Sequence, residues 1–114
     1  MDFETEQYFQ ERRAEQDKIV LEYANLQIKR FYTLDDKAYV DGALPSKVKE
    51  LLGLVSSLVL KCNDCIRYHL GRCHEEGVTD EEIVEALNVG LVVGGSITIP
   101  HLRKALQVWH ELTN

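Results

Sequence analysis

The sequence predicts an all-α fold, and three observations lead to this prediction. Apolar residues recur at the three- and four-residue steps of an α-helix along nearly the whole chain. No stretch has the sustained alternation, bounded by hairpin turns, that is typical of β-strands. The chain has 114 residues, of which 45% are hydrophobic, and this length suits one compact domain with a core of its own.

The N-terminal third is expected to be helical but polar. A helix is predicted from Glu4 to about Lys29, because its apolar residues are embedded in Glu, Gln, Arg and Lys, which favour helices. A further short helix is expected to open at Asp35-Asp36. The Gly and Pro content of residues 41–46 marks the clearest break in the chain. We therefore interpret residues 1–43 as a helical extension and residues 44–114 as the core of a single domain that spans 1–114.

Two helices are predicted directly after this break. Apolar residues at helical spacing make residues 46–61 a strongly amphipathic helix. A second helix is expected over residues 63–76, with Gly77 at the position of a C-terminal cap. The two helices are separated by a very short junction, and Cys62 lies in it.

Two more helices complete the predicted core. Thr79 and Glu82 have the spacing of a capping box, so a helix is expected to start there and to end at Gly94-Gly95. This helix is apolar on most sides, and we expect it to be central. The last helix is predicted to start near Pro100, since proline is favoured in the first turn of a helix.

Composition and charge exclude several classes of function. The net charge is −6 and there is no basic stripe, so nucleic acid is not an expected partner. The longest apolar stretch, residues 87–93, is broken by Asn88 and Gly90 and falls short of the ~20 residues that span a bilayer. The first residues are acidic where a signal peptide would be basic and then apolar. The sequence therefore predicts a soluble cytoplasmic protein with no membrane partner.

The feature that points to chemistry is a Cys62-x-x-Cys65 pair followed by His69. It lies at the junction of two predicted helices, where the unpaired N–H groups of a helix start stabilise a thiolate and lower its pKa. Residues three apart near a helix start also bring their Cα atoms within disulfide range. His69 lies one turn beyond Cys65 and can exchange a proton with its sulfur. Together the three side chains supply a nucleophile, a resolving thiol and a base.

Two other interpretations of the cysteines stay open. The first interpretation is a metal site formed by Cys62, Cys65, His69 and Cys73. These four residues would span ~16 Å along a straight helix, which is too far for one ion to contact both ends. A site with three ligands, or one shared between subunits, is still compatible with the sequence. The second interpretation is that the cysteines are small buried apolar residues without a chemical role, as free cysteines often are. For Cys73 this last interpretation is favoured, because a helix places it ~12 Å from Cys65. No metal or other cofactor is predicted.

The cysteines and the histidine belong to a longer pattern, formed by Glu50, eleven intervening residues, Cys62-x-x-Cys65, three more residues and His69. This pattern resembles the active site of the AhpD-like alkylhydroperoxidase group, within the carboxymuconolactone decarboxylase family. The likeness covers residues 44–106 and includes the glycine and capped-helix run at 75–83. A bare Cys-x-x-Cys is a weak signal, but Glu and His at these offsets make it fairly specific.

The resemblance implies a function and a set of roles. It implies an all-helical thiol–disulfide oxidoreductase with peroxidase activity that assembles as a homotrimer or homohexamer. Cys65 is similar to the peroxide-reacting cysteine, Cys62 to the resolving one, and His69 and Glu50 to members of the proton relay. The implied partners are a peroxide or disulfide substrate and a thiol or lipoyl-type reductant. Asp64 departs from the pattern, because a second His stands there in the best-known subgroup and a carboxylate opposes thiolate formation.

Two other functions are kept beside this one. Decarboxylation of a cyclic lactone is the other chemistry of the family that the sequence resembles, but it needs no dithiol. A redox-sensing or structural oligomer without turnover is the third, in which the apolar helix at 79–94 and the aromatic N-terminal third would form subunit contacts.

The sequence also supports expectations for the environments of Glu50, His101 and Arg67. Without the family pattern, Glu50 would be interpreted as an exposed acid, and it reaches the thiols only if helices 46–61 and 63–76 pack antiparallel. His101 has no partner visible in the sequence and is expected to be a surface or packed histidine. Arg67 is interpreted either as lining the site or as a solvated or salt-bridged helix residue.

Overall fold

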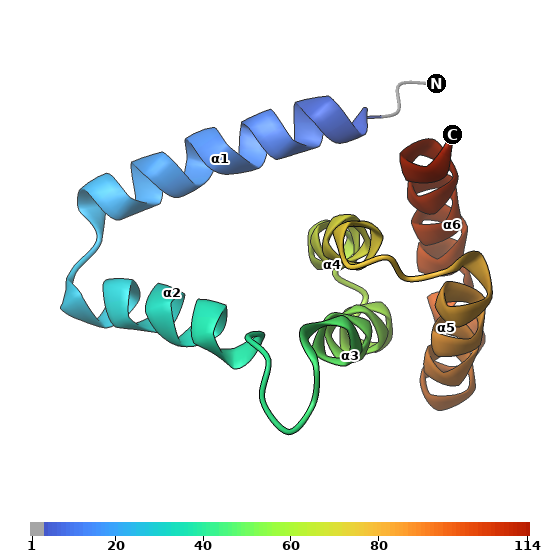
Figure 1. The fold of residues 1–114 in the computed structure, drawn as a ribbon. Helices are drawn as coiled ribbons and strands as arrows, with labels where there is room; N and C mark the ends of the chain where they lie inside the picture. The colour runs from blue at the N-terminus through green and yellow to red at the C-terminus, as the bar shows by residue number, and fades with distance from the viewer. Residues whose placement is uncertain (1–3) are drawn as a thin grey trace. The chain divides into compact units, whose positions relative to one another are not determined.

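The computed structural model describes residues 4–114, and all regular structure among them is helical (Figure 1). This confirms the predicted all-α class. The described helices are α1 (Glu6–Tyr23), α2 (Leu26–Ala38), α3 (Ser46–Val59), α4 (Asn63–Glu75), α5 (Asp80–Gly94), the short 3-10 helix η1 (Ser96–Thr98) and α6 (Ile99–Thr113).

The chain forms two compact units, residues 1–40 and residues 41–114. The single domain over 1–114 stays a prediction. No helix within residues 4–114 is long and apolar enough to cross a membrane. Residues 1–3, on which part of the signal-peptide argument depends, lie outside the described residues, and the cytoplasmic location also stays a prediction.

The first unit contains two helices, α1 and α2, and the break between them lies at residues 24–25, inside the helix predicted over residues 4–29. The side chain of Asn25 accepts a hydrogen bond from the Ile28 N–H at 3.0 Å and caps the start of α2. The single helix expected over residues 4–29 is therefore wrong, and Asn25, a preferred N-cap residue, is the sequence signal for the break. Asp35-Asp36 was expected to open a helix but lies near the end of α2.

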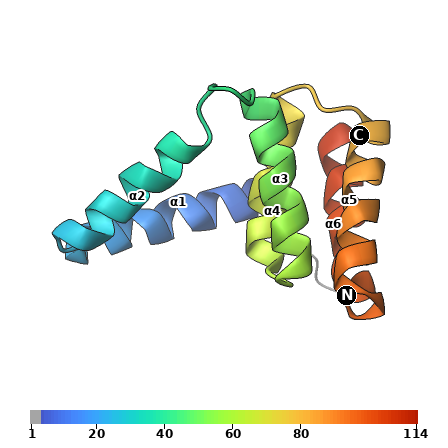
Figure 2. The ribbon, with the colours of Figure 1, turned by 90° about the horizontal axis from the view of Figure 1, so that it is seen from below.

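The second unit is a bundle of four helices. α3 packs against both α4 and α5, and α4 also packs against α6. Figures 1 and 2 show α3 beside α4 and α5 beside α6. All four helices contribute to the core, whose fully buried apolar side chains are Leu54, Leu58, Ile66, Leu70, Cys73, Ile83, Leu87, Ala105 and Val108.

Helix α5 does not occupy the central position expected of it. Its buried residues, Ile83, Leu87 and Gly90, lie on one face. Four valines on its other faces are exposed, namely Val84, Val89, Val92 and Val93. The prediction used apolar content alone, and apolar content does not tell whether neighbouring elements cover every face of a helix.

The predicted helix ends are confirmed in the second unit. Thr79 and Glu82 form both hydrogen bonds of a capping box at the start of α5. Gly77 has φ 76°, the left-handed conformation that follows the end of many helices. Gly95 caps the end of α5, and Pro100 lies in the first turn of α6.

The turn between α3 and α4 fixes the position of the first cysteine. The Lys61 N–H donates to the Leu58 carbonyl and the Cys62 N–H donates to the Ser57 carbonyl, each at 3.0 Å. These two bonds make a Schellman motif at the end of α3, with Lys61 in the left-handed conformation at φ 58°. Cys62 both completes this motif and caps the start of α4, so the backbone leaves it little freedom to move.

Replacing Lys61 with Gly is expected to stabilise the protein. A side chain in the left-handed conformation costs ~1–2 kcal/mol, and the greater freedom of an unfolded glycine offsets part of this, so the free energy of unfolding should rise by about 0.5–1 kcal/mol. Urea denaturation of the wild type, Lys61→Gly and Lys61→Ala measures the effect. The Ala variant loses the charge but keeps the conformational cost, and an equal gain in both variants would contradict this account.

Candidate active site

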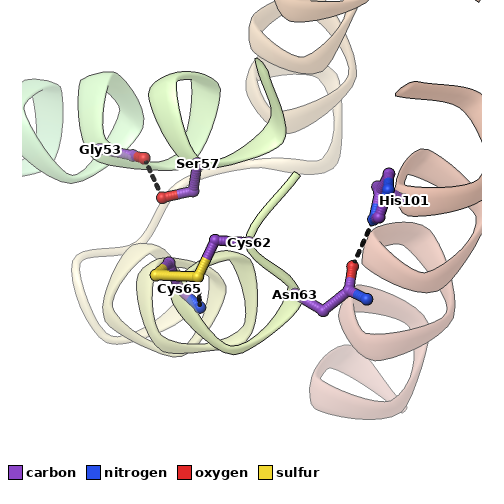
Figure 3. Close-up of a disulfide and its surroundings, with 6 residues drawn as sticks. All are labelled: Gly53, Ser57, Cys62, Asn63, Cys65 and His101. Carbon is purple, nitrogen blue, oxygen red and sulfur yellow. Dashed lines mark hydrogen bonds between the residues drawn. A yellow bond between two sulfur atoms is a disulfide. The ribbon is translucent and has the colours of Figure 1, made fainter. Parts of the chain in front are cut away.

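Cys62 and Cys65 form a disulfide at the start of α4 (Figure 3). Their Cα atoms are 5.3 Å apart. Cys62 is the N-cap residue, and its sulfur accepts a hydrogen bond from the Cys65 N–H at 3.3 Å. In the reduced protein this sulfur would face the unpaired N–H groups of a helix start, which stabilise a thiolate. Cys65 is exposed and Cys62 is half-buried, so a solute can reach the pair.

One helical turn beyond Cys65, His69 meets Glu50 from α3. His69 Nδ1 lies 2.9 Å from Glu50 Oε1. His69 is 7% exposed and Glu50 is 1% exposed, so the interpretation of Glu50 as an exposed acid is wrong. An ionised carboxylate only accepts hydrogen bonds, so beside an ionised Glu50 the ring hydrogen lies on Nδ1 and Nε2 is the nitrogen left without a bond to Glu50.

Arg72 completes this network from α4. Its Nε lies 3.5 Å from Glu50 Oε2, and its other nitrogens pair with Glu75 and, at 3.1 Å, with Glu76. Partial burial alone would lower the pKa of Arg72, but the hydrogen bond to Glu75 and the charges of the carboxylates leave it raised. A buried carboxylate is costly unless it is paired, and Arg72 places a positive charge beside Glu50. Arg72 is not among the residues predicted for the site, although it lies three residues after His69.

Two small residues on α3 also belong to the site, and neither is among the residues predicted for it. Gly53 and Ser57 follow Glu50 at helical spacing, and the Ser57 hydroxyl donates to the Gly53 carbonyl at 2.7 Å. Figure 3 places Ser57 on the side of α3 that faces the disulfide. Small residues at three- and four-residue steps after Glu50 are a sequence signal for close approach between two helices.

Other neighbours of the disulfide come from α4 and α6. His101 Nδ1 lies 2.8 Å from the Oδ1 atom of Asn63, which stands between the two cysteines (Figure 3). His101 thus has the partner that the sequence did not reveal. Arg67 is buried, which excludes a solvated position, and the ring of Tyr68 packs edge-on against His69 with centroids 5.1 Å apart. Within residues 4–114 no group of three or more His, Cys, Asp or Glu side chains is placed to hold a metal ion.

The third cysteine lies in a different environment. Cys73 is fully buried in α4 and forms no disulfide, as the sequence predicted. Burial, aided by the negative charge of Glu50, raises its pKa to about 12.

Cys73 is therefore expected to resist alkylation. With a pKa of about 12, roughly one molecule in ten thousand carries the thiolate at pH 8, and the rate should rise about tenfold per pH unit above that. Treating reduced protein with iodoacetamide and counting labels by mass spectrometry should give two labels, at Cys62 and Cys65. A third label appearing equally fast would contradict the prediction.

The pKa of Cys73 is higher in the folded protein than in an unfolded chain, so the free energy of unfolding should fall as pH rises from the ordinary thiol range toward 12.

The fold and the site together define the class of this protein: an all-helical fold with a Cys-x-x-Cys pair at a helix start and a buried His–Glu pair one turn further on. The family model of the carboxymuconolactone decarboxylase family matches residues 28–108, and the chain belongs to this family. An uncharacterised Paracoccus denitrificans protein from the cox locus is 33% identical over 82 residues, which are 72% of this chain and 74% of that protein.

Solved structures agree with this assignment. Two crystal structures of one Thermotoga maritima protein are 56% and 55% identical to this chain, with TM-scores of 0.91 and 0.89. The matches cover 92% of this chain in both cases, and 92% and 89% of the crystallised chains. The second is described as a carboxymuconolactone decarboxylase family protein for which an antioxidative role is suggested. A Legionella pneumophila family member shares the fold at 24% identity and a TM-score of 0.87, covering 96% of this chain and 97% of its own.

Proposed function

We propose that this protein is a thiol–disulfide oxidoreductase with peroxidase activity. The observation that carries the proposal is the position of the disulfide: a Cys62 sulfur that caps α4, an exposed Cys65 within bonding distance, and a buried His69–Glu50 pair one turn away. A purely structural disulfide would need neither an exposed sulfur nor a buried proton carrier beside it.

The first step is the attack of the Cys65 thiolate on a peroxide. The sulfur bonds to one peroxide oxygen, the O–O bond breaks, and the products are a Cys65 sulfenic acid and an alkoxide. His69, with Nδ1 held by Glu50, takes up the Cys65 proton on Nε2 as the thiolate forms and then gives it to the alkoxide, which becomes an alcohol. The exposure of Cys65 favours it as the attacking sulfur.

The second step forms the disulfide and the third regenerates the dithiol. The Cys62 sulfur attacks the sulfenic sulfur, the S–S bond forms, and the sulfenic oxygen leaves as water. A thiol or lipoyl-type reductant then returns two electrons and two protons by thiol–disulfide exchange. In that exchange Cys62 suits the leaving group, because its sulfur accepts the Cys65 N–H.

Asp64 modulates this chemistry. It is exposed in the first turn of α4, beside Cys65. Its negative charge disfavours a second negative charge on Cys65, while water screens the repulsion. We therefore propose slower peroxide reduction than a neutral or basic residue at this position would allow.

A count of free thiols tests the proposal. Reduced protein receives one equivalent of an organic hydroperoxide, and mass spectrometry of peptides locates any new bond. The proposal expects rapid loss of two thiols and a Cys62–Cys65 linkage, with Cys73 still free. Three unreacted thiols would overturn it.

A second candidate, a redox-sensing or structural oligomer, is favoured by the exposed valines of α5: Val84, Val89, Val92 and Val93. A homotrimer or homohexamer would cover them, and assembly is compatible with either function. Repeated turnover with a dithiol reductant separates the two candidates, since a sensor without turnover stops after one equivalent of peroxide.

Lactone decarboxylation, the reaction for which the family is named, leaves the cysteine pair without a role.

A further inference from the structure

The imidazole ring of His69 lies against the backbone of α3 at Gly53. A Cβ atom added at Gly53 would stand 2.5 Å from Cε1, 2.7 Å from Nε2 and 2.9 Å from Nδ1 of this ring. Contacts below 3.0 Å essentially never occur for real Cβ atoms. The ring therefore occupies space that every other amino acid at position 53 would fill.

The His69 ring is buried and in contact with residues on several sides. His69 is 7% exposed, its Nδ1 is bonded to a carboxylate that is 1% exposed, and Tyr68 packs edge-on against it. An added Cβ would push the ring away from α3, the helix that carries Glu50, so we expect the contact between Nδ1 and Glu50 to break. The missing side chain at Gly53 and the His69–Glu50 hydrogen bond are therefore two parts of one arrangement.

We infer that Gly53 is a positioning residue for His69: it allows the ring to lie on α3, where Glu50 can hold Nδ1 and leave Nε2 for proton transfer. Glycine in the middle of a helix ordinarily destabilises it relative to alanine. At Gly53 an added Cβ would lie within 3.0 Å of three atoms of the His69 ring, and this explains why glycine is present at position 53. The consequence for catalysis rests on the proposed function, but the position of the ring does not.

The first experiment measures the ring directly in Gly53→Ala. The ¹⁵N chemical shifts of the His69 ring report which nitrogen carries the hydrogen. We expect the wild type to hold the hydrogen on Nδ1 and the variant to lose this preference. The matched control is Gly90→Ala on α5, where an added Cβ stands 2.9 Å from Leu58 Cδ2, away from the ring, and the His69 signals should be unchanged. Unchanged His69 signals in Gly53→Ala would overturn the inference.

The second experiment measures the rate of thiol oxidation by an organic hydroperoxide. Gly53→Ala should be slower by about tenfold or more, because a displaced base gives up part of the 10²–10⁴-fold that proton transfer contributes. In a His69→Ala background the same substitution should have almost no further effect, since the ring is gone. Equal losses in both backgrounds would overturn the inference. Should wild-type protein not react at all, the proposed function fails while the ring signals still decide the role of Gly53.

Folding provides a final check. If Gly53→Ala does not fold but Gly53→Ala combined with His69→Ala does, the conflict lies with the ring, as inferred. If neither folds, the conflict lies with the packing of α3 itself, and the inference is overturned.

Discussion

Replacing Cys65 with Ser is expected to abolish peroxide turnover, whereas Cys62→Ser should still react once. Cys65 is the exposed sulfur of the pair, and a serine hydroxyl at its place is not ionised at neutral pH and does not attack the O–O bond. Without Cys62 the sulfenic acid on Cys65 has no partner in the chain, because Cys73 is buried, and it should accumulate. Trapping by dimedone in the absence of reductant detects the sulfenic acid of Cys62→Ser, and peroxide consumption with a dithiol reductant detects the loss of turnover in Cys65→Ser.

The matched control is Cys73→Ala. It removes the third thiol without touching the disulfide, so turnover should stay within about twofold of wild type even where packing costs some stability. Turnover by Cys65→Ser at the wild-type rate would contradict the assignment of the attacking sulfur. Sulfenic acid on Cys62 in place of Cys65 would reverse the two roles.

The second large effect is expected at Glu50. Glu50→Ala removes the acceptor that holds His69 Nδ1 at 2.9 Å, and the rate of thiol oxidation should fall by about 100-fold or more. Glu50→Gln keeps an oxygen that can accept from Nδ1 but loses the charge, so a smaller fall of about tenfold is expected. Stopped-flow measurement of thiol oxidation at several pH values gives both numbers.

The control for Glu50 is Glu85→Gln, which changes an exposed acid on α5 and should leave the rate unchanged. Stability provides a second readout, because loss of the buried carboxylate leaves the His69 N–H unsatisfied and should lower the free energy of unfolding by about 1–3 kcal/mol. A Glu50→Ala variant that oxidises as fast as the wild type would show that His69 needs no orienting carboxylate.

The sequence predicted those parts of the fold that are encoded by neighbouring residues. Thr79, Gly77 and Pro100 mark helix ends correctly because capping depends on residues within one turn of each other. The same reasoning applied to Asn25 would have located the break between α1 and α2. The position of α5 was mispredicted, because covering a helix face depends on elements distant in sequence.

The candidate site was predictable only in part for the same physical reason. Cys62, Cys65 and His69 follow one another on one helix, so their relation is a matter of spacing. Glu50 lies nineteen residues before His69, and only the family resemblance singled it out. Gly53 carries no functional group at all, so its importance becomes visible only when the ring that lies on it is seen.

The burial of Cys73 has a consequence for how the protein withstands oxidants. A chain with three cysteines has one sulfur left over when two are paired, and an accessible leftover thiol would cross-link copies of the chain through intermolecular disulfides. Here the leftover sulfur has no exposed surface and a pKa of about 12, so it is neither reachable nor ionised at neutral pH. Cys73 should therefore not join copies of the protein covalently under the conditions in which the exposed pair reacts.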